Sequence, residues 1–279
     1  TKLSVQFSQN LLAETNDFEI ILDQADLVGL PDDIVDLAKL EAENKFSKNK
    51  DNKYKDKYVF TVQRSSMYPF LTYSTRRDLR EKLYKGYIQR GDNNNEYDNK
   101  DITSKIASLR VEKANILGFE SHAHYVLDNT MAKTPEAVYG LLNQLWAPAL
   151  KRAKNELNEM QILANEEGNN FEIASWDWWH YAEKVRKDKY DLDEEEIKEY
   201  FTLDNTIDGI FKTSNKLFGL TFEEKFDLDL YHPDARVWEV KDKDGSHIGL
   251  YIGDYYTRSS KRGGAWMSSF KTQSNFDGK

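Results

Sequence analysis

Cysteine is absent from this sequence of 279 residues. Its absence excludes disulfide bridges and thiolate metal sites, and it leaves the redox compartment open because reducing and oxidising locations both tolerate a cysteine-free chain. Histidine is scarce, with 5 residues, and no two histidines are four positions apart. The sequence therefore lacks the H-E-x-x-H motif of hydrolytic zinc sites, and it also lacks the G-x-S-x-G signature of serine hydrolases.

Long apolar runs, basic tails and linkers are missing as well. No run approaches the length of a membrane span, so we expect no membrane partner. The formal net charge is -9, which argues against general nucleic-acid binding. The 5 prolines and 14 glycines form no low-complexity linker. No period of about 20–50 residues repeats, which argues against a solenoid.

The first residues, TKLSVQFSQN, contain neither an initiator methionine nor a signal peptide, because a basic n-region and an apolar h-region are both missing. We therefore expect the chain to begin inside a longer gene product. A cytoplasmic location is favoured, with the periplasm as the alternative because the true N-terminus is not in this chain.

Aromatic residues make up 13% of the chain and apolar residues 39%, which is the material of a substantial core. Apolar side chains recur at helical spacing over most of the chain up to residue 220. The sequence predicts a mainly α fold with one brief strand near 58–62. The predicted helices begin at residue 30, with a solvated loop at 44–53 after the first, and continue at 74–90, 99–117, 134–168, 175–189, 193–201 and 205–218.

The longest predicted helix covers 134–168. Thr134 is its expected N-cap and Pro135 its first helical residue. An apolar stripe follows one face, and Pro148 within it predicts a kink instead of an end, because the stripe stays in phase across the proline. The stripe consists of Trp146, Leu150, Ala153, Leu157, Met160 and Ala164.

Near the C-terminus the apolar period changes from that of a helix to that of a strand. Residues 236–240 and 247–252 flank an Asp-Gly pair at 244–245, which is a preferred tight hairpin turn. Such a turn places Trp238 opposite Tyr251.

Two regions follow from these patterns. Residues 1–220 form a helical region that includes the brief strand, and residues 221–279 form a region with a β-hairpin and a glycine-bearing segment. We expect both to be one continuous part of a larger domain.

The glycine-bearing segment, KRGGAWM at 261–267, places two glycines between a pair of cations and a large aromatic residue. It matches neither the dinucleotide-binding nor the P-loop pattern of a phosphate cradle. Glycine permits close approach of another backbone, and Arg258, Lys261 and Arg262 are suited to hold a carboxylate through charge-assisted hydrogen bonds. A plain surface turn is the alternative interpretation.

Several blocks of the chain resemble the zinc oligopeptidases of the thimet oligopeptidase and bacterial peptidyl-dipeptidase (dipeptidyl carboxypeptidase) type. The similarity runs in order over nearly the whole chain. The blocks are RRDLREKLY at 76–84, YDNK at 97–100, LRVEKA at 109–114, MAKTPE at 131–136, WDW at 176–178, YF at 200–201, YHPD at 231–234, residues 249–254, and KRGGAWM at 261–267.

This resemblance implies a large, mainly helical peptidase whose two lobes enclose a deep channel for short unstructured peptides. The single zinc of the family is held by an H-E-x-x-H helix and a later Glu, and the Glu of the motif activates the water. That helix follows the KRGGAW block in the family, so the resemblance implies that this chain is an internal, helical channel-wall segment with a small antiparallel hairpin or sheet near its C-terminus. No catalytic residue and no metal ligand can be carried over onto it.

The resemblance further implies zinc as the cofactor of the full-length parent and no cofactor in this chain alone. The expected partners are short unstructured peptides and the C-terminal zinc-bearing part of the same protein. We expect Arg262, Gly263, Gly264, Ala265 and Trp266 to lie beside the channel, where they bind substrate.

The function predicted in this way is that of a zinc metallopeptidase segment that is inactive by itself. A non-enzymatic helical peptide-binding or scaffold module is the alternative, and an inter-subunit structural domain is disfavoured because no heptad seam stands out. An H-E-x-x-H motif in the coding sequence beyond Lys279 selects the first function, and a stop codon selects the second. Helices that pack on a missing lobe should leave apolar stripes exposed.

Overall fold

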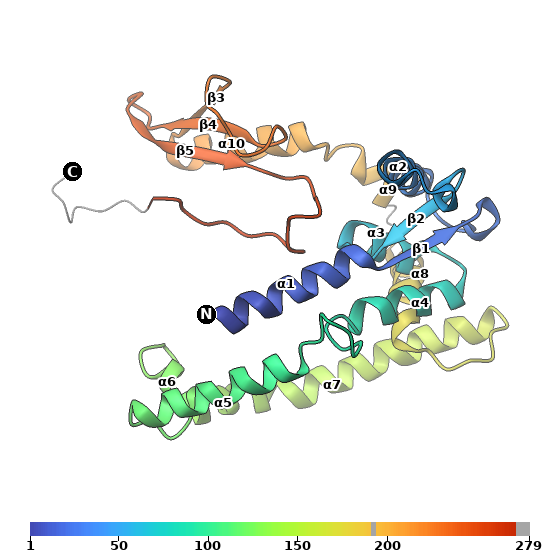
Figure 1. Ribbon diagram of the computed structural model, residues 1–279, viewed down its shortest axis with the longest axis horizontal. Coiled ribbons are helices and arrows are strands. Elements are labelled where there is room, and N and C mark those ends of the chain that lie inside the picture. The colour runs from blue at the N-terminus through green and yellow to red at the C-terminus, as the bar shows by residue number, and fades with distance from the viewer. Residues whose placement is uncertain (191–193, 272–279) are drawn as a thin grey trace. The chain divides into compact units, whose positions relative to one another are not determined.

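The computed structural model describes residues 1–190 and 194–271. Two compact units divide the chain: the first comprises 1–185 together with the segment from Ser259 onward, and the second comprises 186–258. Helices predominate and two small antiparallel sheets accompany them, so the predicted mainly α fold is confirmed (Figure 1). No helix in the described part of the chain is both long and apolar enough to cross a bilayer.

The first unit contains a two-stranded sheet and the helices that cover it. Strand β1 (Glu19–Leu22) pairs antiparallel with β2 (Tyr58–Thr61), so that Ile20 lies opposite Phe60. The strand near 58–62 is thus confirmed, while its partner strand was not predicted. The other elements of this unit are α1 (Lys2–Asp17), η1 (Gln24–Asp26), α2 (Asp32–Asn49), η2 (Asn52–Tyr54), α3 (Arg64–Tyr73), α4 (Arg77–Ile88), α5 (Lys100–Ile116), α6 (His122–Leu127), α7 (Pro135–Glu166), η3 (Ser175–Asp177) and most of α8 (Trp178–Tyr190).

The main core of this unit lies between the sheet and three helices. Helices α2 and α3 pack against β2, and α4 packs against α3. The rings of Phe60 and Phe70 meet edge to face with centroids 4.7 Å apart. Each fully buried side chain of this size contributes about 1.5–3 kcal/mol. The core includes Ile20, Leu22, Phe60, Met67, Phe70, Leu71 and Leu83.

Helix α2 is longer than the sequence predicts. It runs through the region expected to be a solvated loop, so the prediction for 44–53 is wrong in its first half. Phe46 packs against a small buried cluster that includes Tyr54. Lys45 also forms an ion pair with Glu19 at 2.8 Å. These tertiary contacts stabilise additional helical turns that local composition alone does not favour.

Helix α7 agrees with the prediction for 134–168. The hydroxyl of Thr134 accepts a hydrogen bond from the Ala137 amide at 3.3 Å, which is the expected N-cap. Pro148 lies inside the helix without ending it. The helix stops just before Gly168, which adopts a φ of 82° and so provides the left-handed residue that commonly follows a helix.

The apolar stripe of α7 is buried only toward its C-terminal end. Met160 and Ala164 pack in one cluster with Tyr181 of α8. Trp146 and Leu150 are 68% and 40% exposed, so the described residues of the first unit do not cover this part of the stripe. An apolar face of this kind marks a surface that binds another segment or molecule.

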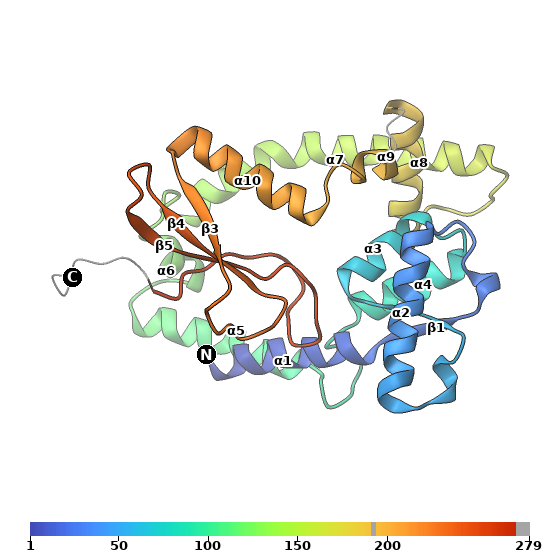
Figure 2. The same ribbon diagram turned by 90° about the horizontal axis from the view of Figure 1, so that it is seen from above.

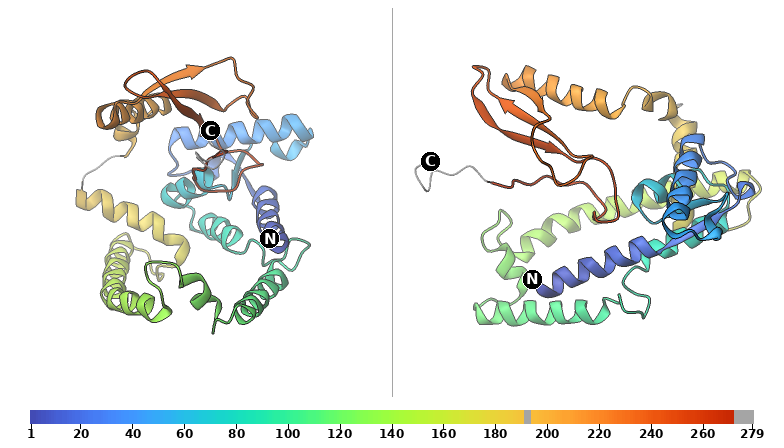
Figure 3. Two further views of the ribbon diagram at one scale, coloured as in Figure 1. Left: turned by 90° about the vertical axis from the view of Figure 1, so that its left-hand side faces the viewer. Right: turned by 45° about the horizontal axis from the view of Figure 1, so that its top comes forward.

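The second unit is a three-stranded antiparallel sheet with a helix beside it (Figures 2 and 3). Phe211 of the helix stacks on Phe222 of the first strand, with ring centroids 4.0 Å apart. The predicted division at residue 220 falls inside this unit, at the point where strands replace helices. A helix was expected to begin at residue 193, which lies outside the described residues. The elements are α9 (Glu194–Lys198), α10 (Leu203–Phe218), β3 (Thr221–Lys225), β4 (Arg236–Lys241) and β5 (His247–Gly253), in the sheet order β3-β4-β5.

The hairpin of β4 and β5 confirms the predicted register. Trp238 lies opposite Tyr251, and their ring centroids are 5.6 Å apart. The connection is longer than the predicted two-residue turn, because the register shifts at the end of β4. Within it, the Asp242 amide donates to the Ser246 carbonyl at 2.9 Å.

A buried ionic network joins α4 to the start of α8. The Asp177 carboxylate is 0% exposed and accepts three hydrogen bonds from the Arg77 guanidinium, at 2.9, 3.0 and 3.1 Å. Arg80, itself 2% exposed, donates to the same carboxylate at 2.8 Å and to the Ser74 carbonyl at 2.7 Å. The Ala174 amide adds a further bond at 3.1 Å. Charges buried in this way are stable only while they remain paired.

Replacing Asp177 by Asn should lower the free energy of unfolding by about 3–5 kcal/mol, because Arg80 then stays buried without its counter-charge. Urea unfolding near neutral pH measures the loss. Asp78→Asn is the matched control, since that carboxylate pairs with Arg76 at the surface and its loss should cost less than about 1 kcal/mol. Equal losses in the two variants would contradict the assigned role of the network.

His180 is buried one helical turn after Asp177. Its Nδ1 lies 2.9 Å from the Thr72 carbonyl oxygen, in position to donate a hydrogen bond. Burial, and then the charge of Arg80, lower the pKa of His180 from 6.5 to about 4. Between about pH 4 and pH 6.5, His180 binds a proton in the unfolded chain but stays neutral in the folded chain. His180 therefore contributes stability that is complete above about pH 6.5 and is lost as the pH falls toward about 4.

The free energy of unfolding should accordingly fall by about 3 kcal/mol through this residue as the pH drops across that window. The variant His180→Gln has no titrating group there and should lose this part of the pH dependence. The variant His247→Gln, at an exposed position, should keep it. Urea unfolding at several pH values tests the pair, and an unaltered pH profile in His180→Gln would refute the assignment.

Candidate functional site

The glycine-bearing segment (261–267) is part of the stretch 259–271, which belongs to the first unit and lies beside α1 (Figures 1 and 3). The side-chain amide of Asn16, near the end of α1, donates a hydrogen bond to the Ser259 carbonyl at 3.0 Å. From there the chain runs without helix or strand as far as the described residues extend. This anchor fixes the start of the segment at α1, next to the predicted substrate-binding residues Arg262 and Gly263.

Two residues of this segment line a small cavity with a volume of about 250 Å³. One wall is a single face of α1, whose four lining residues are spaced i, i+3, i+4 and i+7. The turn from β2 into α3 and the end of α4 form the other walls. We call this space the small cavity, and its lining residues are Ser8, Leu11, Leu12, Thr15, Val62, Gln63, Arg64, Tyr87, Arg90, Arg262 and Gly263.

The structure separates the five predicted substrate-binding residues into two groups. Arg262 and Gly263 line the small cavity, whereas Gly264, Ala265 and Trp266 are not among its lining residues. All five are exposed, which leaves them accessible to a ligand. Their contact with a peptide stays a prediction.

Gly263 and Gly264 differ in whether the backbone conformation at their position requires glycine. Gly264 adopts a φ of 112°, and a Cβ built there meets no atom within 4 Å. A Cβ at Gly263 would lie 4.0 Å from Nε of Arg64, an ordinary contact. Backbone conformation, and not crowding by a neighbour in this chain, is therefore the reason that position 264 needs glycine.

Arg258 and Arg262, two of the three cations expected to hold a carboxylate, differ in their ion pairing. Arg258 makes a forked ion pair with Asp254, with one nitrogen–oxygen distance of 2.9 Å. Tyr231 donates to the same carboxylate at 3.1 Å, and partial desolvation, followed by this bond, raises the pKa of Tyr231. The charge of Arg258 is thus compensated. Arg262, by contrast, has no carboxylate partner among the described residues.

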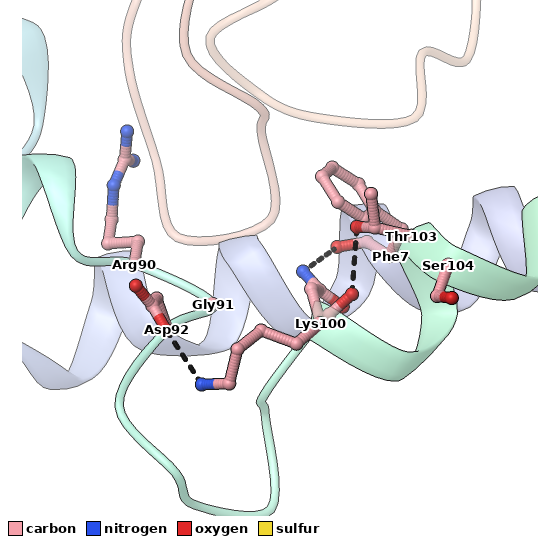
Figure 4. A pocket seen from close by; sticks show the side chains of 8 residues that line it. Phe7, Arg90, Gly91, Asp92, Lys100, Thr103 and Ser104 are labelled. Carbon is pink, nitrogen blue, oxygen red and sulfur yellow. Dashed lines mark hydrogen bonds and ion pairs between the residues drawn. The ribbon is translucent and has the colours of Figure 1, made fainter. Parts of the chain in front are cut away.

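A larger cavity, of about 510 Å³, also includes Arg90 (Figure 4). Its other charges are already paired, because Lys100 bonds to Asp92 at 2.6 Å and to Asp98 at 2.5 Å, and both carboxylates raise the pKa of Lys100. Sequence reasoning missed this cavity, for which the one signal is the run DNNNEYDN at 92–99. The lining residues are Phe7, Arg90, Gly91, Asp92, Asn99, Lys100, Thr103 and Ser104.

The described residues contain no group of three His, Asp or Glu side chains close enough together to hold a metal ion. A catalytic zinc requires three protein ligands and an open position. The side chains that the structure describes therefore do not fit a catalytic zinc, and no chemical step through a metal follows from them.

Comparison with known proteins points to one family. The model of peptidase family M3 matches residues 70–279. The chain is 38% identical over 277 residues to the dipeptidyl carboxypeptidase of Escherichia coli (strain K12), an alignment that covers 99% of this chain and 40% of that protein. It is 33% identical over 272 residues to oligopeptidase A of Salmonella typhimurium (strain LT2), which covers 96% of this chain and 39% of that protein. The chain thus spans about 40% of the length of the curated relatives that it matches.

A plant relative shows the same pattern. The organellar oligopeptidase A of Arabidopsis thaliana, chloroplastic/mitochondrial, is 33% identical over 280 residues, which cover 98% of this chain and 35% of that protein. The similarity therefore extends through both compact units and includes the glycine-bearing segment.

Proposed function

This chain belongs to peptidase family M3, and on that premise we propose that it is part of a zinc metallopeptidase that hydrolyses short peptides. The family is zinc-dependent in general. Two relatives are named for peptide hydrolysis, as dipeptidyl carboxypeptidase and oligopeptidase A. The proposed activity is accordingly of the peptidyl-dipeptidase or oligopeptidase type.

The observation that carries this proposal is the extent of the match. The alignment takes in 99% of this chain but 40% of the dipeptidyl carboxypeptidase. We propose that the zinc site lies in a part of the protein outside this chain, because no H-E-x-x-H motif is present in the sequence. The exposed apolar stripe of α7 supports this arrangement, since it offers a face for the remaining part to cover.

We propose short unstructured peptides as substrates and the residues 262–266 as part of their binding surface. Arg262 and Gly263 supply a cation and an open backbone at the small cavity. Gly264 allows the sharp change of direction that presents them. A non-enzymatic peptide-binding module would use the same surface, so measurements of zinc and hydrolysis separate the two functions.

The full-length protein should contain about one zinc per chain and should hydrolyse a short peptide in a chelator-sensitive way. The 279-residue chain should contain no stoichiometric zinc and should not hydrolyse that peptide. Elemental analysis and a fluorogenic peptide assay measure both properties. One tightly bound zinc in the 279-residue chain would refute the proposed position of the site, and an inactive full-length protein would select the non-enzymatic alternative.

In the full-length protein, Gly264→Val should lower kcat/KM for short peptides by about tenfold, because a β-branched residue cannot hold the native backbone conformation. The matched control is Gly245→Val in the loop between β4 and β5. That position has a φ of 85° and equally open surroundings, so it carries the same strain outside the proposed surface. Equal kcat/KM values for Gly264→Val and the wild type, at equal thermal stability, would exclude 264 from the binding surface.

A further inference from the structure

Arginines of this chain pair with carboxylates as a rule, in keeping with its excess of 48 acidic over 39 basic residues. Arg64, Arg90, Arg110 and Arg262 depart from this rule, since each lacks a carboxylate partner among the described residues. The pairs that the rule describes are Arg76 with Asp26 and Asp78, Arg77 and Arg80 with Asp177, Arg152 with Glu156, Arg236 with Glu224 and Asp204, and Arg258 with Asp254.

Three of the four exceptions line the small cavity. Arg64, Arg90 and Arg262 come from the start of α3, the end of α4 and the glycine-bearing segment, and no lining residue of the cavity is acidic. Three like charges around a space of about 250 Å³ repel one another. An anion that enters the cavity relieves that repulsion.

Arg90 is held in place by neutral acceptors. Its guanidinium donates to the Tyr87 carbonyl at 2.8 Å and to the Thr15 hydroxyl at 2.6 Å, and it lies 3.9 Å from the centre of the Tyr87 ring. Figure 4 shows this side chain directed away from the ion pair of Asp92 and Lys100. The guanidinium of Arg90 is therefore oriented, while no carboxylate of the described part of the chain compensates its charge.

Arg64 adds a second source of positive potential. It is the first residue of α3, and the N-cap Gln63 makes no side-chain capping bond. The unsatisfied amides at a helix N-terminus attract negative charge. Both residues line the small cavity, so the end of this ten-residue helix and the guanidinium of Arg64 act in the same place.

The walls of the small cavity distinguish an organic carboxylate from a bare inorganic anion. Leu11, Leu12 and Val62 form apolar surface, while Ser8 and Gln63 add polar groups. An inorganic ion makes no use of the apolar wall, whereas an amino-acid residue places its carbon atoms there and its carboxylate against the guanidinium groups. The volume of about 250 Å³ accommodates one residue and not a long peptide.

We propose that the small cavity is a carboxylate subsite, in which Arg64, Arg90 and Arg262 bind either the C-terminal carboxylate or an acidic side chain of a peptide. The peptide as the source of the carboxylate rests on the proposed function. The subsite itself rests on the shape of the cavity and on three arginines that have no carboxylate partner within 1–190 and 194–271.

Equilibrium binding of labelled peptides to the full-length protein, with a chelator present to prevent turnover, tests this subsite. Three probes are compared: tetra-alanine with a free C-terminus, its C-terminal amide, and the amide of Ala-Glu-Ala-Ala. At least one carboxylate-bearing probe should bind about tenfold more tightly than the neutral amide, and that preference should weaken at high salt. The probe that shows the preference identifies a terminal or a side-chain carboxylate as the bound group.

The variants Arg64→Gln and Arg262→Gln should each remove most of this preference and leave the binding of the neutral amide within about twofold. Both positions are exposed, so the fold should persist, and Arg64→Lys, which restores the charge, should recover part of the preference. Arg110→Gln is the matched control, because Arg110 is also exposed and unpaired among the described residues but does not line the cavity.

Equal binding of all three probes would overturn the subsite, as would a preference that Arg64→Gln and Arg262→Gln leave unchanged. Tight binding of inorganic phosphate without any preference among the peptides would also overturn it, in favour of a free-anion site. These outcomes are independent of catalysis. A full-length protein that prefers carboxylates but hydrolyses nothing refutes the proposed function alone, and one that hydrolyses peptides without the preference refutes the subsite alone.

Discussion

The pairing of one buried carboxylate with two guanidinium groups constrains the helices of the first unit. Asp177 accepts hydrogen bonds from Arg77 and Arg80, and Arg80 also donates to the carbonyl of Ser74, the residue that ends α3. The first turn of α4 and the start of α8 therefore meet at a single anion, and Arg80 links the end of α3 to it. The two guanidinium groups outnumber that anion, and the charge of Arg80 joins burial in keeping His180 neutral. Arg80 thus links the packing of these helices to the protonation of His180.

A second buried carboxylate holds α1 in place against the chain that follows α4. Glu14, which is 5% exposed, accepts hydrogen bonds from the side chains of Asn93 and Asn95 at 3.0 and 2.6 Å and also from the Gly91 amide. The chain that follows α4 is in this way fastened to α1. Because Arg90 directly precedes that fastened turn, its guanidinium has a fixed position relative to the α1 face of the small cavity. Glu14 therefore helps to set the geometry of the small cavity, although it does not line that cavity.

The same polar contacts explain which elements the sequence predicts and which it conceals. Helix α7 was predictable because Thr134, Pro135 and a long apolar stripe all indicate a helix. Helix α1 was not, since its buried residues are Asn10, Glu14 and Thr15, and a search for apolar periodicity takes such a face for a solvated one. Strand β1 is four residues long, too short for its alternation to stand out. The loop prediction that failed in α2 failed for a related reason, because distant contacts hold those helical turns.

The candidate site was predictable only where it is local in sequence. Arg262 and Gly263 stand out within seven residues that contain two glycines and two cations, whereas Arg64 and Arg90 carry no local signal and reach the cavity through tertiary folding. Arg64 and Arg90 stand out only when the ion pairs of the other arginines are known. Asp177 is paired with Arg77 and Arg80, and Glu14 accepts hydrogen bonds from amides. Neither buried carboxylate therefore neutralises the arginines of the small cavity. In a chain of net charge -9, an anionic peptide is repelled by most of the surface and attracted where cations lack partners. The distribution of ion pairs, more than the number of charges, therefore decides where a carboxylate binds.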